Sequence, residues 1–119
     1  MSTEQLENFE ELGRRAVACP RWRWMPGMLA IMPARRTTTA RVSDVGWCSD
    51  ESDRPDLTDP ATLGCLLALV REVWGDPSVG IFRSALGQEW CVLIQKGGLQ
   101  GFHATTEAAA LVAALEVAP

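Results

Sequence analysis

Residues 59–75 read DPATLGCLLALVREVWG, and this stretch decides where the centre of the fold should lie. Asp59 is a favoured N-cap residue, Pro60 suits the first helical position, and Gly75 suits the position just past a helix end. Between them, apolar side chains recur at helical spacing, at Leu63, Leu66, Leu67, Val70 and Trp74. The pattern predicts a helix over 60–74. We expect it to be the most buried helix, with Leu66, Leu67 and Val70 in the core.

The sequence before this helix predicts one helix and two strands. An amphipathic pattern over 2–18 indicates a helix that ends before Pro20. A short extended segment at 21–24 and a Pro-Gly turn at 26–27 follow. Strands are then expected at 28–32 and 36–43, the second rich in β-branched residues.

The sequence after the central helix predicts a hairpin and a closing helix. The strands should cover 78–85 and 89–96, joined across Leu86-Gly87, and a short extended piece should cover 99–104. The last helix should open at Thr105 or Thr106 and run to about Val117. Strand 89–96 is apolar on both faces, which indicates an interior strand or one that a partner covers.

The predicted order is α-β-β-α-β-β-(β)-α, which is typical of an α+β domain. We expect a single antiparallel β-sheet of about four to five strands with helices packed on it. The 119 residues, 47% of them hydrophobic, fit one globular domain over 1–119. No run approaches the roughly 20 apolar residues of a membrane span, and the acidic N-terminal segment is unlike a secretory signal.

Charge and cysteine usage narrow the class of protein further. The net charge of −4 argues against duplex DNA as a partner, because general DNA binding relies on a basic surface. Cys19, Cys48, Cys65 and Cys91 are widely spaced, without a CxxC pair, and the chain has a single histidine. This spacing disfavours a metal site and favours buried, reduced thiols in a cytoplasmic protein.

The sequence contains no motif of a known catalytic type. His103 has no neighbouring nucleophile in the sequence, and GGLQG at 97–101 lacks the lysine of a phosphate-binding loop. We therefore expect a protein that is not an enzyme and that needs no cofactor, and we interpret His103 as a structural or surface residue.

The stretch RWRWMPGM at 21–28 is the main candidate site. If the segment is extended, its two tryptophans share one face and its two arginines the other. One interpretation is that the tryptophans are core and the arginines solvated. The other is an aromatic shelf that stacks a base while arginine holds phosphate. The candidate ligand-binding residues are Arg21, Trp22, Arg23, Trp24, Arg36 and Trp47.

A second candidate surface is the acidic loop at 44–59, which carries six acids and one arginine. It does not fit the calcium-loop pattern, and a solvated loop is the simplest interpretation. The alternative is a mimic of nucleic-acid charge that binds a protein. The candidate partner-binding residues are Asp50, Glu51, Asp53 and Asp56.

Two resemblances add a biological setting to these residues. VACPRWRWMPGMLAIM at 17–32 resembles the signature of small phage anti-Thoeris sponge proteins, with matches at Val17, Ala18, Trp22, Gly27 and Met28. The similarity covers at most a third of the chain, and the closing Asp-Trp element of that family is not evident. Over its whole length the chain resembles a group of small phage and prophage accessory proteins, a likeness that implies no particular biochemical activity.

The resemblances imply a phage accessory protein with an anti-defence role in the cytoplasm of the host cell. The leading hypothesis is a protein that sequesters a nucleotide-derived immune signal without turning it over, with a homo-oligomer as one expected state. The alternative is an inhibitor that binds a host defence protein complex, similar to an anti-CRISPR protein, through the acidic loop. A structural or assembly partner is a third, weaker interpretation.

Overall fold

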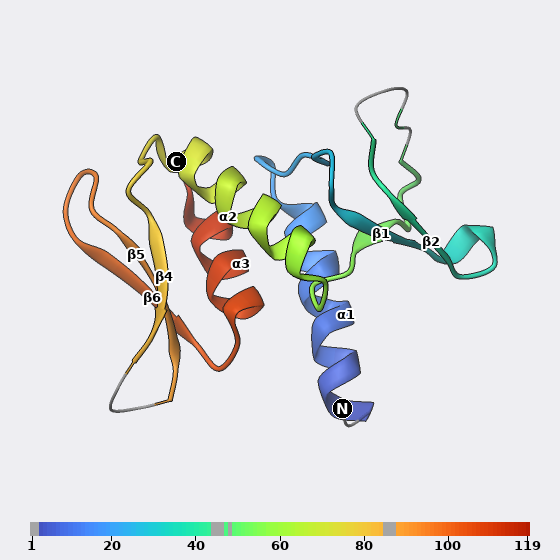
Figure 1. Cartoon of the computed structure of the whole chain (residues 1–119), viewed down its shortest axis with the longest axis horizontal. Helices are drawn as coiled ribbons and strands as arrows, with labels where there is room; N and C mark the ends of the chain where they lie inside the picture. The colour runs from blue at the N-terminus through green and yellow to red at the C-terminus, as the bar shows by residue number, and fades with distance from the viewer. Residues whose placement is uncertain (1–2, 44–46, 48, 85–87) are drawn as a thin grey trace.

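The computed structural model describes residues 3–43, 47, 49–84 and 88–119, with side chains from Asn8 onward (Figure 1). Within these ranges the chain forms three helices, a short 3-10 helix and two separate three-stranded antiparallel sheets. No helix of the described part is long and apolar enough to cross a membrane. The class is α+β, as predicted, but the single sheet of four to five strands is wrong.

The first sheet, sheet A, has the strand order β2-β1-β3, and all of its residues precede the central helix. It contains β1 (Leu29–Met32), β2 (Thr38–Arg41) and β3 (Arg54–Pro55), with the 3-10 helix η1 (Pro33–Arg35) between β1 and β2. β3 lies in the loop for which the sequence predicts no regular structure. A strand of two residues is too short to show any periodicity, so the sequence pattern did not indicate it. The segment 21–24 forms no strand.

The second sheet, sheet B, has the order β4-β5-β6 and follows the central helix. Its strands are β4 (Gly80–Arg83), β5 (Trp90–Ile94) and β6 (Gln100–Ala104). β1 and β5 are the central strands of their sheets, and among the described residues no edge strand of sheet A pairs with an edge strand of sheet B. The predicted turn at Leu86-Gly87 lies outside the described residues.

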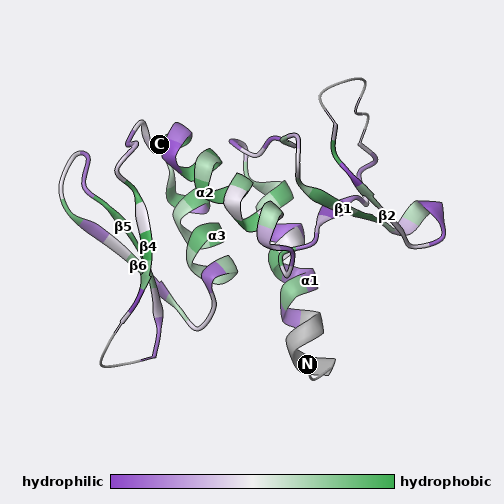
Figure 2. Cartoon of the chain, in the orientation of Figure 1, coloured by the Kyte–Doolittle hydropathy of each residue, from purple (hydrophilic) through white to green (hydrophobic). Residues whose placement is uncertain are grey.

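The helices lie between the two sheets (Figure 1). They are α1 (Thr3–Ala18), α2 (Pro60–Trp74) and α3 (Glu107–Val117), and α3 contacts α1, α2, β5 and β6. In α3, six of eleven residues are buried, against five of fifteen in α2. The most buried helix is therefore α3, and our expectation for 60–74 is wrong. Figure 2 shows hydrophobic residues gathered on these two helices.

The bounds and caps of α2 are as predicted. The Asp59 side chain accepts a hydrogen bond from the Thr62 backbone N–H, and Gly75 ends the helix with the left-handed φ of 62°. Leu66 and Val70 are fully buried, whereas Leu67 is only half-buried. The helix therefore has two distinct sides, one in the main core and one at the surface.

A chain of hydrogen bonds joins sheet A to the start of α2. Arg41 donates to the Asp59 carboxylate over 2.6 Å, and this contact is the main reason why the pKa of Asp59 lies below its usual range. Asp59 also accepts from the Thr62 hydroxyl, which in turn accepts from the backbone N–H of Leu29. The capping residue thus positions a strand as well as a helix.

Candidate functional site

The predicted tryptophans come together, but they face one another. Trp22 and Trp24 make an edge-to-face contact with ring centroids 5.3 Å apart, and Trp24 lies 5.9 Å from Trp47. All three are half-buried and pack against Met28, Ala30, Met32 and Val42, the small core of sheet A. Trp22 also packs against the main core. We call Trp22, Trp24 and Trp47 the tryptophan cluster.

The predicted arginines are exposed and lie apart. Arg21 donates to the backbone oxygen of Pro119, and Arg23 forms an ion pair with Glu72 over 2.7 Å. Arg36 lies beyond the other end of β1, in the connection to β2, with a positive φ of 59°. Along 21–24 the arginines are exposed and the tryptophans half-buried, so the segment alternates as expected. Arg36 does not join the tryptophan cluster.

Several carboxylates of the acidic loop accept hydrogen bonds from residues of the loop itself. The Asp50 carboxylate accepts from the N–H and hydroxyl of Ser52, which lowers its pKa, and Asp56 accepts from Thr58 in the same way. Asp53 is 3% exposed and accepts from the backbone of Asp50. Of the four predicted acids, Asp50 and Glu51 are exposed to a partner. Asp44 lies outside the described residues.

The thiols agree with the sequence interpretation where they are described. Cys19, Cys65 and Cys91 are free, Cys19 and Cys91 are buried, and Cys65 is half-buried in α2. Burial raises the pKa of the Cys19 and Cys65 thiols, which keeps them protonated at neutral pH. Cys48 lies outside the described residues.

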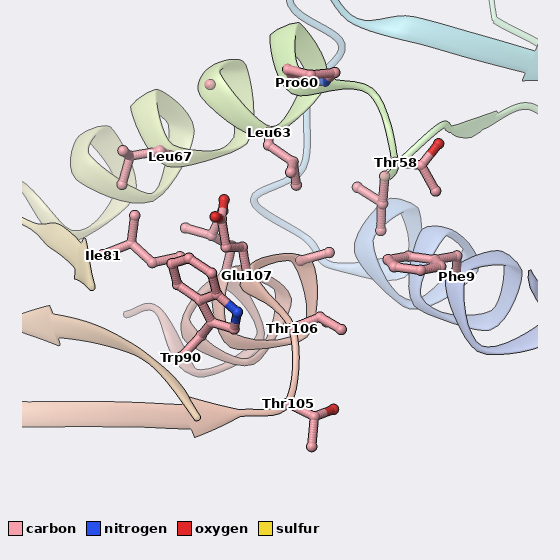
Figure 3. Close-up of a pocket in the computed structure, with 14 residues that line it drawn as sticks. Phe9, Thr58, Pro60, Leu63, Leu67, Ile81, Trp90, Thr105, Thr106 and Glu107 are labelled. Atoms are coloured by element: carbon pink, nitrogen blue, oxygen red, sulfur yellow. The ribbon is translucent and has the colours of Figure 1, made fainter. Parts of the chain in front are cut away.

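A groove of about 630 Å³ lies between α2, sheet B and the start of α3, a volume typical of ligand sites (Figure 3). Trp90 stands at one end of this groove and Phe9 of α1 at the other. Its apolar lining includes Leu63, Leu67, Ile81 and Leu111. We call it the Trp90 groove.

Polar groups in the groove are few and confined to one side. Glu107, the first residue of α3, projects its carboxylate between Leu63 and Trp90 (Figure 3). This carboxylate has no hydrogen-bond or ion-pair partner among the described residues. The nearby N-terminus of α3 favours a negative charge there. Thr58, Thr105 and Thr106 line the same groove, but the Thr58 hydroxyl donates to Asp56 and the Thr106 hydroxyl caps α3.

A cation stands beside the aromatic end of the groove. Arg83 pairs with Trp90 across β4 and β5, and its guanidinium carbon lies 5.9 Å from the centroid of the Trp90 ring. Arg83 is exposed and has no carboxylate partner in the described part of the chain. Stacking surface, hydrogen-bond acceptor and positive charge therefore lie within one region.

Sequence reasoning assigned Trp90 to a strand face and overlooked it as a site residue. Glu107 and Arg83 carried no signal, because they are 24 residues apart and belong to no motif. One clue was available: Arg83 and Trp90 lie near the facing ends of the two predicted hairpin strands, 78–85 and 89–96, where cross-strand pairs form.

The chain matches no protein-family model, no curated protein and no solved structure at a significant level.

Proposed function

We propose that this protein is a non-enzymatic binding protein that captures a nucleotide-derived ligand in the Trp90 groove. The observation that carries the proposal is that Trp90 and Glu107 line one groove of ligand size, with the guanidinium of Arg83 beside the Trp90 ring. A base would stack on the indole of Trp90. Its exocyclic amino group would donate to Glu107, and a phosphate would pair with Arg83.

The same chemistry is offered less well by the tryptophan cluster. Its rings pack against each other and against the core of sheet A. Arg23 is neutralised by Glu72. Under the hypothesis of a sponge for an immune signal, we therefore place the binding surface in the Trp90 groove and not at 21–24.

The anti-defence setting comes from the resemblance and is part of the proposal. Sequestration requires binding without turnover. The groove suits this role because, among the described residues that line it, only Glu107 is charged, and a single carboxylate is a poor basis for acid–base pairs or nucleophilic attack. The alternative inhibitor that binds a defence protein through the acidic loop receives less support, because Asp53 is buried and Asp56 is tied to Thr58.

The test is calorimetric titration of the protein with cyclic dinucleotides and cyclic ADP-ribose variants, followed by chromatography of the recovered ligand. We expect binding, and an unaltered ligand. Trp90→Ala should weaken binding about 5- to 150-fold, the loss of one base-stacking contact. Glu107→Gln should shift the preference among bases, because the amide keeps the shape and loses the charge.

Matched controls separate the groove from the tryptophan cluster. Arg83→Ala should weaken binding and reduce its salt dependence, whereas Arg23→Ala, another exposed arginine, should leave both unchanged. Unchanged affinity in the Trp90, Glu107 and Arg83 variants would rule out the groove. If Trp24→Ala and Arg21→Ala then weakened binding, the site would lie at 21–24.

A further inference from the structure

The face of sheet B that points away from the helices brings together a cysteine and the only histidine of the chain. Cys91 and His103 are direct partners across β5 and β6, with the Cys91 Sγ 3.8 Å from the His103 Nε2. Cys91 is buried but belongs to neither core cluster, and His103 is exposed. The pair lies on the opposite side of β5 from Trp90 and the groove.

The separation of these two atoms suits a shared metal ion. A tetrahedral zinc ion with bonds of about 2.3 Å to sulfur and 2.0–2.1 Å to nitrogen holds those atoms about 3.6 Å apart. The observed 3.8 Å is close to this value. Both atoms are common ligands of zinc, cobalt and copper.

Gly101 keeps the space beside both atoms open. A Cβ atom at this position would lie 3.1 Å from the His103 Nε2 and 3.4 Å from the Cys91 Sγ. Any larger side chain would push into the gap between the two ligands.

A single chain supplies only half of such a site. Among the described residues, no group of three or more His, Cys, Asp or Glu could hold a metal. A structural zinc site normally has four ligands, so two more must come from elsewhere. A second copy of this chain, related by a two-fold axis, would supply the same cysteine and histidine again.

The surrounding face suits a second copy. No helix covers this side of sheet B in the described ranges (Figure 1). Phe82 is 47% exposed on it, and Leu99, just before β6, is 74% exposed. The two central rows of this face contain Gly80, Phe82, Cys91, Leu93, Gly101 and His103. Apart from His103, none of these residues is of a charged type. Two chains of net charge −4 can therefore meet here without local repulsion.

The face is too small to hold a dimer without the metal. Three strands about 4.8 Å apart and five residues long span roughly 15 by 16 Å, or about 240 Å². Stable interfaces bury about 800 Å² on each partner. We therefore infer that Cys91 and His103 form half of a transition-metal site, completed by the same pair of a second copy, and that dimerisation depends on the metal.

The experiment uses the full chain, stripped of metal and then titrated with Co²⁺ and, in competition, with Zn²⁺. Absorption reports a tetrahedral cobalt site with thiolate ligands, and light scattering reports the mass. We expect one metal ion for two chains, a doubled mass with metal, and a monomer without it.

Variants identify the ligands. His103→Asn changes an exposed residue, so the fold should survive, and both the cobalt spectrum and the doubled mass should disappear. Gly101→Val should weaken binding by filling the gap, and Cys65→Ser, which removes a thiol of α2, should change neither readout. One metal per chain with unchanged mass, retained binding in His103→Asn, or no binding of either metal would each overturn the proposal.

Discussion

Sheets A and B have the same number of strands and the same antiparallel pairing, but they are covered in different ways. Sheet B has α3 against its inner face, so its apolar row of Ile81, Val92 and Phe102 meets a helix. Sheet A buries Met28, Ala30 and Met32 under the tryptophan cluster, which comes from irregular chain.

This difference explains how the tryptophans are used. Three large rings from coil segments and Cys65 of α2 pack against the small core of sheet A, and α1 contacts β3. On sheet B the helix does the covering. Our proposals place ligands at Trp90, on the edge of this sheet, and at Cys91, on its outer side.

The largest effect that we expect is a loss of stability when a tryptophan that packs on sheet A is removed. Trp22→Ala should lower the free energy of unfolding by about 3–5 kcal/mol, because this ring packs against both core clusters. Trp90→Ala should cost clearly less, because that ring borders an open groove. Urea denaturation measures both. Equal losses would mean that the two rings do not differ in role.

The next effect separates the two sides of α2. Leu66→Ala should cost about 2–5 kcal/mol, because this residue is fully buried. Leu67→Ala should cost less, since Leu67 is half-buried and lines the groove. Denaturation midpoints of the two variants give the comparison, and a greater loss for Leu67 would place the groove side of α2 in the core.

A smaller effect concerns the link between α2 and sheet B. The hydroxyl of Ser78 and the backbone N–H of Gln95 donate to Asp76 and lower its pKa to about 2. Its ordinary pKa is about 3.9. Because the pKa of Asp76 is lower in the folded protein, its ionised carboxylate stabilises the fold at pH values above its ordinary pKa. This stabilisation is lost as the pH falls through about 2.

The measurement for Asp76 is the denaturation midpoint between pH 5 and pH 2, compared with Asp76→Asn. The wild type should lose more stability over this interval than the variant, whose side chain does not titrate. Parallel curves would show that the Asp76 contacts do not contribute.

The smallest effect concerns the arginines of 21–24. Arg23→Ala should change stability by less than about 1 kcal/mol, because Arg23 and Glu72 are 54% and 52% exposed. Glu72→Ala serves as the matched control, and thermal melts at low and high salt measure both. A loss as large as that of Trp22→Ala would make the ion pair, and not the rings, the cover of sheet A.

The sequence predicted the elements that carry their own local signals. Asp59, Pro60 and Gly75 mark the ends of α2, and the helix bounds agree with the structure. The strands β1, β2, β4 and β5 fall inside their predicted ranges, and Thr106 caps α3 as one of two expected positions. Capping, backbone preference and side-chain periodicity act over a few residues, so they can be read in order along the chain.

The tertiary structure alone decided which elements pair and which residues meet. Arg54–Pro55 completes sheet A from a segment without periodicity, a pairing that no local pattern indicates. The contact of Cys91 with His103, and of Arg83 with Trp90, depends on strand register, and register is set by packing against α3. Whether a tryptophan covers a core or lines a groove depends on what lies opposite it, and distant parts of the chain supply that neighbour.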